Sequence, residues 1–562
     1  MLCAAMVYAP FALGSIPPVA ITLLVTWLFV SSGLWAVDCI QERRLPRFSW
    51  TLLVPAGWVL TLGWFMTWNA YATSLPLSSV STPIAPHLPL APGSENQAVS
   101  LLAMLRLTAM LSTVFVTADL ARNPLWRGRF LYALAFTGAG IALFGLVQQA
   151  GLVTLIARKM NSYEGAYFST FNYHANAGAY LNLALAPLCV LCVASFLAPQ
   201  AQQRKAVATA LLLLVVAATL TNTSRGAQAI TLGLLLTLGS WGAWRLLAKS
   251  PGMAKYRRMI LPAVLGVILL AFSAILLRYG RDAEKWRQLP AQLTEDSSRW
   301  QVWRVTVPMA MEGGAFGHGP GTFKMLLPRS PLLTNALYSR WIIQQHVPGT
   351  KISMWSMAHD DYLQTWVEFG WVGAILCGVL FFGGIVQGFG RMWRLSGASP
   401  GPQDYSWLGI VAALIGVAIH ATFDFPLQVA SLQVTVAVLL GMCWSPSPPS
   451  ISGAGKGSKG AAAPEWAAIG KALKSLKAKI PLPRQGRAYC CDLRIRPQIR
   501  RNEGRNRWAV PAYSEDHGAS SPARTRMAAP AYSTGREEWF QARTRRGATA
   551  SREGWECPAP DC

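Results

Sequence analysis

From Asp296 to Phe323 the chain reads DSSRWQVWRVTVPMAMEGGAFGHGPGTF, a charged and glycine-rich stretch inside a longer polar segment, residues 279–364. Long apolar runs precede and follow this segment. A run of about 20 apolar residues is long enough to cross the hydrocarbon core of a bilayer as a helix. The alternation predicts a membrane protein in which residues 279–364 form a large loop before the last three helices.

The composition of the 562-residue chain agrees with this class. It is 52% hydrophobic and 13% charged, whereas soluble domains average about 25% charged residues. A short apolar run at 2–15 and eleven longer runs predict an all-α polytopic protein with about 12 transmembrane helices. We expect the longer helices at about 19–38, 50–69, 99–118, 129–150, 175–197, 206–222, 227–246, 259–278, 365–388, 406–424 and 427–445.

Lysine and arginine are unevenly divided between the loops, and their distribution predicts the orientation. Residues 70–98 contain neither, whereas one alternate set of loops is basic: Arg43, Arg44, Arg47, Arg122, Arg127, Arg129, Arg204, Lys205, Lys249, Lys255, Arg257, Arg258, Arg391 and Arg394. Basic loops face the cytoplasm. The rule places 279–364, 151–174 and the turn 222–226 on the outer face, and both termini inside. If residues 2–15 do not span the membrane, the N-terminus lies outside and nothing else changes.

The last part of the chain differs in composition from the rest. Residues 447–464 are rich in Gly, Ser and Pro and predict a flexible linker. Near 463–481, apolar residues at helical spacing alternate with lysines, as in a basic helix lying on a membrane surface or in a marginal, frayed one. The Arg-rich remainder is predicted to be disordered. We expect a transmembrane domain, 1–446, and a cytoplasmic tail, 447–562. Basic loops explain most of the net charge of +25, so no nucleic-acid partner is expected.

Four clusters of polar residues lie at the ends of predicted helices or in the large loop, where function is the default reading. Each has a structural alternative: capping by asparagine, an arginine reaching lipid headgroups, an interfacial helix, or a His–Asp pair at i, i+4. The candidates are Asn172, His174 and Asn176; Arg225; Arg299 and Arg304 with His359, Asp360 and Asp361; and His420 with Asp424.

Two motifs in the loop superficially suggest a phosphate-binding loop and a metal site, but their spacing supports neither. GHGPG at 317–321 lacks the GxGxxG pattern and the following Lys-Ser/Thr of nucleotide loops, so it predicts a sharp turn. His359, Asp360 and Asp361 are adjacent, and neighbours on a helix point about 100° apart, which makes a poor chelate. We expect no metal and no cofactor. A single histidine at a watery site suits proton transfer.

The charged groups fit one kind of chemistry on the outer face. The chain has no P-loop, so an enzyme there needs a donor that is already activated, such as a polyprenyl-diphosphate sugar. Arginine forms paired hydrogen bonds with phosphate oxygens and stabilises a departing diphosphate. A neutral histidine can take the proton of an attacking hydroxyl.

TSRGA at 223–227, SRWQVWR, GHGPGTF and AHDDYLQTWVEFGWVG occur in an order that resembles the O-antigen ligase/polymerase superfamily. FNYHANAGAYL and HATFDFPLQ resemble its flanking segments, over roughly 160–430. The resemblance implies a GT-C-like helical fold in the bacterial inner membrane. It also implies metal-independent, inverting transfer of a glycan from a polyprenyl-diphosphate carrier to lipid A-core or another acceptor. By motif position, Arg225 and Arg299, with Arg304 as a helper, would bind the diphosphate, and His359 would be the base.

Two alternatives to a ligase stay open. A polymerase of the same superfamily joins repeat units on the same carrier, and the sequence hardly separates it from a ligase. A solute transporter belongs to another class, but transporters place polar residues near the membrane midplane on broken helices. The polar candidates of this chain gather at the outer ends of the predicted helices instead.

Overall fold

The computed structural model describes residues 1–74, 81–152, 167–197, 202–249, 298–330, 357–396 and 405–446, together with Pro262, Gly266 and Trp286. All of them lie in the first of two units, Met1–Lys456. Apart from Pro262 and Gly266, the helix predicted at 259–278 lies outside the described residues. The tail predicted at 447–562, with its amphipathic helix near 463–481, also lies outside them.

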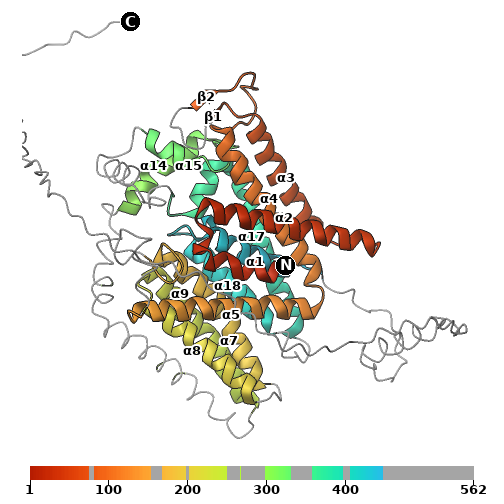
Figure 1. The fold of residues 1–562 in the computed structure, drawn as a ribbon, viewed down its shortest axis with the longest axis vertical. Coiled ribbons are helices and arrows are strands. Elements are labelled where there is room, and N and C mark those ends of the chain that lie inside the picture. Colours follow the sequence, from red (N-terminus) through yellow and green to blue (C-terminus); the bar gives the residue numbers. More distant parts are fainter. Residues whose placement is uncertain are drawn as a thin grey trace, which may run out of the picture. The chain divides into compact units, whose positions relative to one another are not determined.

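The described part of the chain is almost entirely helical (Figure 1). Its α-helices are α1 (Leu2–Phe11), α2 (Pro18–Gln41), α3 (Trp50–Trp68), α4 (Gln97–Leu120), α5 (Pro124–Gln149), α7 (His174–Leu197), α8 (Gln202–Thr221), α9 (Arg225–Lys249), α14 (Ser298–Glu312), α15 (Phe323–Leu326), α17 (Asp361–Ser396), α18 (Ser406–His420) and α19 (Ala430–Trp444). Short 3-10 turns are η1 (Leu13–Ser15), η2 (Leu327–Arg329) and η4 (Pro426–Gln428). The sequence did not predict the antiparallel hairpin of β1 (Ala72–Ser74) and β2 (Ser81–Pro83).

Eight of the described helices are long and apolar enough to cross a membrane: α2, α3, α4, α5, α7, α8, α9 and α17. Three apolar helices are shorter: α1, α18 and α19. The ten residues of α1 rise about 15 Å, half of a hydrocarbon core of about 30 Å. The described part of the chain is mostly helical and is consistent with an all-α polytopic membrane protein.

The last two predicted helices are shorter than expected, and the difference creates part of the site. The sequence predicted helices at 406–424 and 427–445, but α18 ends at His420 and α19 begins at Ala430. The peptide before a proline is disfavoured in helical conformation, and Phe425, which precedes Pro426, has φ −123° and ψ 47°. Residues 421–429 therefore form an irregular connection between α18 and α19, and its side chains can contact neighbouring elements.

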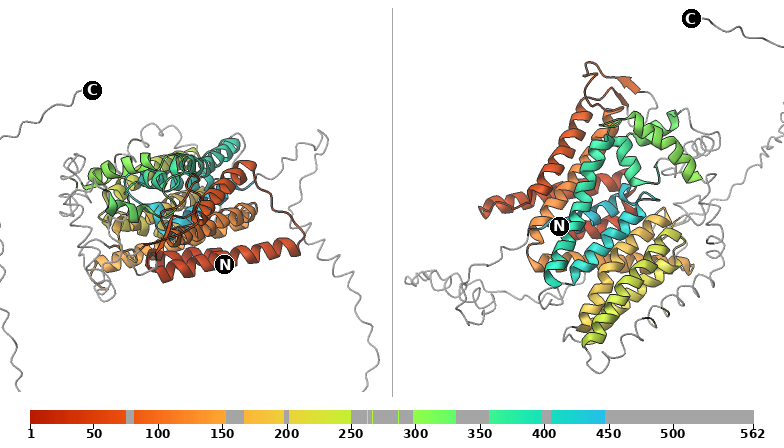
Figure 2. Two further views of the ribbon diagram at one scale, coloured as in Figure 1. Left: turned by 90° about the horizontal axis from the view of Figure 1, so that it is seen from above. Right: turned by 180° about the vertical axis from the view of Figure 1, so that it is seen from behind.

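Helix α7 occupies the centre of its neighbourhood, where it packs against α18, α9, α8 and α5. Figure 2 shows α7, α8 and α9 running side by side. Small residues permit the close approach, as is common between membrane helices. A Cβ built on Gly178 of α7 would lie 2.3 Å from the Cβ of Ala227 in α9. A side chain at Gly178 would push these helices apart.

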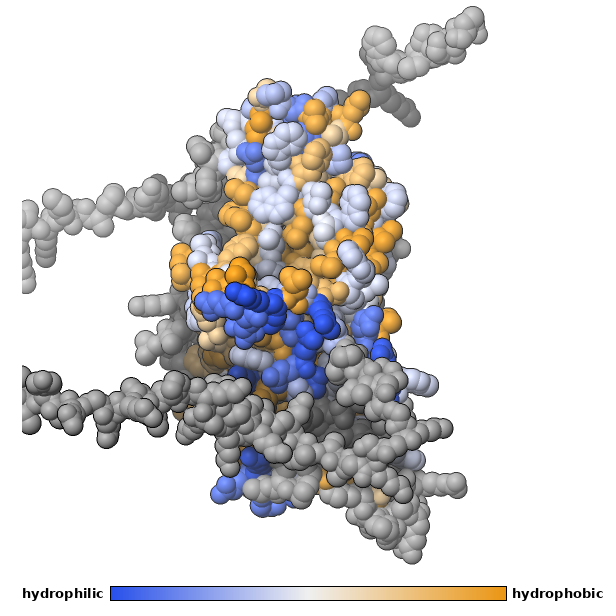
Figure 3. Space-filling model, turned by 90° about the vertical axis from the view of Figure 1, so that its right-hand side faces the viewer, coloured by the Kyte–Doolittle hydropathy of each residue, from blue (hydrophilic) through white to orange (hydrophobic). Residues whose placement is uncertain are grey.

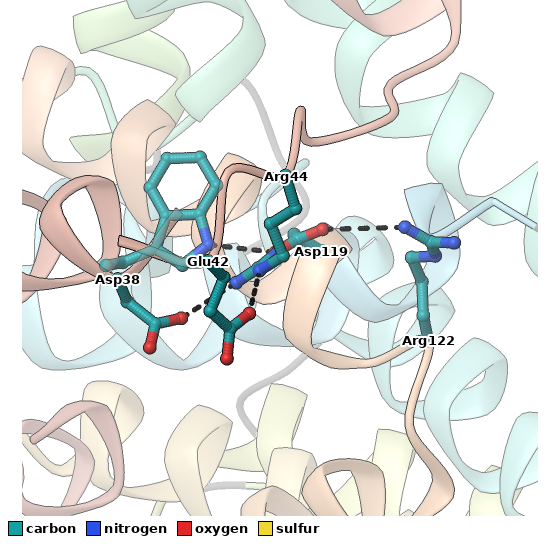
Figure 4. Close-up of polar contacts among 6 residues, drawn as sticks. Asp38, Glu42, Arg44, Asp119 and Arg122 are labelled. Atoms are coloured by element: carbon teal, nitrogen blue, oxygen red, sulfur yellow. Dashed lines mark hydrogen bonds and ion pairs between the residues drawn. The ribbon is translucent and has the colours of Figure 1, made fainter. Parts of the chain in front are cut away.

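Polar side chains tie several helices together inside the domain. Between α7 and α9, the Asn182 amide donates to the carbonyl of Ala227 (2.9 Å) and accepts from the Thr231 hydroxyl (2.7 Å). At the end of α4, the buried Asp119 carboxylate accepts hydrogen bonds from Arg44 and from the Trp35 indole (Figure 4). The second network joins α2 and the segment after it to α4.

A break in α17 provides the seat for the glycine-rich turn. Gly370 interrupts the helix with φ 65° and ψ −177°, and a Cβ there would lie 2.3 Å from the backbone of Ala315. The freed backbone groups bond across the break: the N–H groups of His318 and Gly319 donate to the carbonyls of residues 367 and 368, and those of residues 371 and 372 donate to Gly314 and Ala315. The exchange holds the loop containing α14 against α17.

The surface of the described residues has regions suited to contact with lipid and regions suited to contact with water. On the face shown in Figure 3, hydrophobic residues are widespread, and the strongly hydrophilic ones gather mainly in one region. Many large apolar side chains on the predicted membrane helices are exposed, including Val19, Leu23 and Ile40 of α2, Phe136 of α5 and Val386 of α17. Such exposure suits lipid contact rather than contact with water.

Candidate active site

His359 lies directly before α17 in a backbone conformation that is uncommon for residues other than glycine, with φ 54°. Its neighbours hold it there. The carbonyl of Ala358 accepts from the Trp303 indole of α14 (3.1 Å), and its N–H donates to the Gln364 side chain (3.2 Å). Strained backbone of this kind clusters at functional sites.

Asp360, the next residue, acts as the N-cap of α17. Its Oδ1 accepts from the backbone N–H groups of Tyr362 (3.0 Å) and Leu363 (2.9 Å). Burial raises the pKa of Asp360, and these two hydrogen bonds oppose the rise. Asp360 therefore has a capping role that orients the histidine before it, in line with the preference of helix N-termini for aspartate.

Asp424 is the residue to which the other groups of the site converge. Its Oδ1 lies 3.3 Å from Nδ1 of His359, and both side chains are only 2% exposed. Its Oδ2 lies 3.7 Å from a terminal nitrogen of Arg299 and accepts from the Tyr173 hydroxyl at 3.4 Å. One buried carboxylate thus joins a histidine before α17, an arginine in the first turn of α14 and a tyrosine before α7.

These neighbours determine the charge of Asp424. Burial by itself raises the pKa of this carboxyl, but the hydrogen bond and charge of His359 and the charge of Arg299 outweigh burial and lower the pKa to about 2. Asp424 is therefore ionised at neutral pH. In the opposite sense, burial first and the Asp424 charge second raise the pKa of the Tyr173 hydroxyl, which stays protonated and can donate.

Aromatic rings enclose the His359–Asp424 pair. Tyr173 stacks on Phe425 with centroids 5.5 Å apart and planes within 5°. The His359 ring meets Phe425 edge-on at 4.8 Å. Apolar walls reduce local screening and strengthen the charge interactions between them.

Arg225 begins α9, and a short network fixes the turn before it. The Asn222 carboxamide accepts from the Ser224 N–H (2.9 Å) and donates to the carbonyl of His174 (2.8 Å). The Ser224 hydroxyl accepts from the N–H of Ala227 (3.3 Å), which caps the helix. The charges of Arg225 and Arg299 interact with each other. Two arginines, each in the first turn of a helix, thus lie in one neighbourhood, and helix N-termini favour anions.

The structure separates the remaining predicted residues by position. Arg304 is exposed and lies five residues after Arg299 on α14, about 140° further round the helix. Asp361 is buried, and its Oδ2 accepts from the N–H of Leu427 (2.8 Å), which ties α17 to η4. Arg304 therefore lies on a different side of α14 from Arg299, and Asp361 joins two elements that border the site.

The pair predicted between His420 and Asp424 does not form on one helix, because α18 ends at His420. His420 is buried and stacks on Phe423 at 5.2 Å, and its charge interacts with that of Asp424. Asn172 is half-buried, and Asn176 is buried with a carbonyl oxygen that has no hydrogen-bond partner among the described residues. His174 contributes its backbone carbonyl to the Asn222 network.

Sequence reasoning did not single out Tyr173, Arg106 or Glu368. Tyr173 stood inside the FNYHANAGAYL segment, and nothing in its local pattern set it apart. Arg106 and Glu368 could have been found, because each is a charge within a predicted transmembrane helix, and such charges are rare and functional by default. Within the described ranges, no group of three or more His, Cys, Asp or Glu side chains is arranged to hold a metal ion.

Comparison with known proteins adds one match to this geometry. Residues 207–378 match the family model described as O-antigen ligase. This match supports the resemblance of the chain to the O-antigen ligase-like superfamily. No curated protein matches the chain.

The O-antigen ligase match covers most of α8, all of α9 and the region through the break in α17, and so includes Arg225, Arg299 and His359. Asp424 and Tyr173 lie outside the matched residues and reach the site only through the fold. Together with the apolar helices, the match supports a multi-pass membrane protein related to the O-antigen ligases.

Proposed function

We propose that this O-antigen ligase-like protein transfers a glycan from a polyprenyl-diphosphate carrier to lipid A-core or another envelope acceptor. The observation that carries the proposal is the Asp424 carboxylate, which lies 3.3 Å from His359 and 3.7 Å from Arg299. It couples a candidate proton acceptor to a candidate phosphate-binding group. A carboxylate beside a histidine is a recurring way of orienting a general base.

The proposed reaction is a single displacement. The acceptor hydroxyl attacks the anomeric carbon while the bond from that carbon to the diphosphate oxygen breaks, so the configuration inverts. Asp424 keeps a proton on Nδ1 of His359, and Nε2 takes the proton from the attacking hydroxyl. The products are the glycosylated acceptor, the polyprenyl diphosphate and a protonated histidine. Because His359 is 2% exposed, the side chains above it must shift when the acceptor binds.

Arg225 and Arg299 are assigned to the diphosphate. Their guanidinium groups bind phosphate oxygens in pairs and balance the charge that develops on the leaving group. The positive ends of the helix dipoles of α9 and α14 add to the positive potential at the diphosphate. Arg304 is a helper that acts from another side of α14, and Asn172, His174, Asn176, Asp360, Asp361 and His420 are supporting residues. No metal or cofactor takes part in the proposed step.

The proposal includes a topology. Residues 1–446 form a GT-C-like domain of about 12 membrane helices in the bacterial inner membrane, with 279–364 as a periplasmic catalytic loop. Both termini are cytoplasmic, and 447–562 is a basic cytoplasmic tail. Candidate groups at the beginning of α9 and α14 and between α18 and α19, rather than at mid-helix, favour transfer over transport.

Replacement of His359 by alanine tests the chemistry. In proteoliposomes containing a polyprenyl-diphosphate glycan, His359→Ala should lower turnover per folded protein about 10²–10⁴-fold. Donor binding should remain, because both arginines are intact. His87→Ala, which alters an exposed loop histidine, is the matched control and should transfer normally. Near-normal turnover of His359→Ala, or activity restored only by added metal, would exclude this role.

A polymerase is the second candidate, since the sequence motifs resemble a superfamily that contains both ligases and polymerases. Extraction of lipid-linked glycans from a strain without the protein separates them. A ligase leaves full-length polymer on the carrier, and a polymerase leaves single repeat units. Accumulation of neither species would refute both.

A further inference from the structure

A cavity lies where α4, α17 and α19 face one another. Its volume is about 290 Å³, at the lower end of the roughly 300–1,000 Å³ typical of small-molecule sites. Most of its lining is apolar and comes from the middle of the three helices, including Leu111, Val114, Phe381, Val436 and Leu440. All three helices are apolar segments of the membrane domain. The shape and lining suit a hydrocarbon chain.

The other end of the cavity is charged. Arg106 of α4, Glu368 of α17 and Gln428 of η4 line it there. Within the described part of the chain, the Arg106 guanidinium makes one hydrogen bond, a long one of 3.4 Å to the carbonyl of Gln428. A charge inside a membrane helix is costly, and it usually marks a site for an ion, a substrate or a partner.

The Glu368 carboxylate forms its hydrogen bonds with groups other than Arg106. Its two oxygens accept from the N–H of Gly321 (2.8 Å) and from the Gln364 amide (3.1 Å). The charge of Lys324 in α15 acts on both Arg106 and Glu368. Both carboxylates of the lining, Glu368 and Asp361, already accept hydrogen bonds from the backbone. The Arg106 charge at the end of an apolar cavity favours an anionic group.

Two buried acceptor atoms at the same end also lack partners among the described residues. They are Oδ1 of Asp361 and Oε1 of Gln433, and both residues line the cavity. Buried polar atoms are rarely left without a hydrogen bond. A ligand that carries hydroxyl groups next to its anionic group would supply the missing donors, while Arg106 meets the anion.

We propose that the cavity between α4, α17 and α19 binds a phosphate-bearing lipid, with one hydrocarbon chain between the helices and the phosphate at Arg106. This site differs from the pairing of His359 with Asp424, although Asp361 and η4 form a wall common to both neighbourhoods. The proposal does not depend on glycan transfer, because it concerns binding alone. Two sources supply this chemistry: bilayer phospholipid such as phosphatidylglycerol, and polyprenyl monophosphate.

Gly378 of α17 offers a substitution that fills the cavity. A Cβ there would meet only the Phe382 ring, at 4.0 Å, and both residues line the cavity. Replacing glycine inside a helix also favours the helical state, so Gly378→Leu should fold. Gly390→Leu in the same helix is the matched control, since its Cβ would meet only the end of Arg394 at 3.9 Å and Gly390 does not line the cavity.

The measurement is lipid binding to the full-length protein in nanodiscs by native mass spectrometry, with phosphatidylglycerol, phosphatidylcholine and polyprenyl monophosphate as probes. We expect Gly378→Leu to weaken binding of a phosphate-bearing lipid by at least about tenfold. Gly390→Leu should stay within about twofold of the natural protein. Whichever of phosphatidylglycerol and polyprenyl monophosphate loses more affinity in Gly378→Leu is the natural class of ligand.

The charge is tested separately with Arg106→Gln. The natural protein should bind phosphatidylglycerol about tenfold more tightly than phosphatidylcholine at the Gly378-sensitive site, and Arg106→Gln should remove that preference. Arg122→Gln, at an exposed arginine after α4, should retain it. Unchanged affinities in Gly378→Leu, or a preference that survives in folded Arg106→Gln, would overturn the proposal. If Arg106→Gln does not fold, the Gly378→Leu result decides alone.

Discussion

Replacement of Asp424 by asparagine perturbs the centre of the candidate active site with the least change of shape. The variant keeps the size of the side chain and an oxygen that can face His359, but it removes the negative charge. In the natural protein that charge lies 3.3 Å from Nδ1 of His359 and 3.7 Å from Arg299. An asparagine can also turn its NH₂ toward the ring and favour the wrong histidine tautomer.

The pKa of Asp424 gives the size of the effect on stability. A pKa lowered from the usual 3.8 to about 2 corresponds to about 2 kcal/mol, at about 1.36 kcal/mol per pH unit. A carboxyl with a lowered pKa stabilises the fold above its unfolded pKa, and this contribution is lost as the pH falls from about 3.8 through about 2. At neutral pH the contribution is complete, so Asp424→Asn should lose up to that amount.

The effect on transfer should be much larger than the effect on stability. If Asp424 orients the base, turnover of Asp424→Asn should fall about 10²–10⁴-fold, while donor binding is kept because Arg225 and Arg299 remain. Rates are measured in proteoliposomes and divided by the amount of folded protein. Between pH 5 and 8 the natural protein should show no loss of activity from titration of Asp424.

Asp119→Asn is the matched control, because Asp119 is also a buried carboxylate paired with an arginine, Arg44. It should lower the melting temperature and leave turnover per folded protein unchanged. Transfer by Asp424→Asn within about twofold of the natural protein would exclude an orienting role for Asp424. Equal losses in the two variants that follow their folded fractions would exclude it as well.

The remaining predictions concern the donor site, the fold and the topology. Arg225→Lys and Arg299→Lys keep the charge but lose the planar fork, so each should weaken donor binding and transfer strongly; unchanged donor affinity would argue for a lipid-anchoring role. Gly370→Ala places a Cβ 2.3 Å from the backbone of Ala315. It should lower the melting temperature by several degrees in a thermal scan, and an unchanged melting temperature would contradict this prediction. In a background without accessible native cysteines, a cysteine at Ser330 should react with a membrane-impermeant thiol reagent in intact spheroplasts, and protection would reverse the orientation. Deletion of 451–562 should leave transfer intact, and lost activity at normal membrane abundance would refute a dispensable tail.

Most membrane helices could be predicted from the sequence because burial in lipid imposes a length and a composition on each one independently of its neighbours. The helix predicted at 175–197 forms as His174–Leu197, and the one predicted at 50–69 forms as Trp50–Trp68. The ends after His420 and before Ala430 were wrong by several residues. There the Pro426 ring, rather than hydropathy, decides where helical geometry stops.

The partner of His359 could not be read from the sequence. Asp424 stands four residues after His420, so local spacing paired those two, but the helix ends between them and Asp424 instead meets His359, Arg299 and Tyr173. These groups come from distant parts of the chain. Their meeting depends on the packing of α7, α14, α17 and α18, which no local pattern encodes.

By itself, the sequence determined the membrane class and the candidate residues Arg225, Arg299 and His359, because charge, apolar length and motif order are properties of short segments. Only the tertiary structure decided that Asp424 joins His359 to Arg299, and that Arg106 lies at one end of an apolar cavity. The physical reason is that a buried charge is tolerated only where neighbouring elements supply its partners. Those partners are fixed by how helices pack, not by their order in the chain.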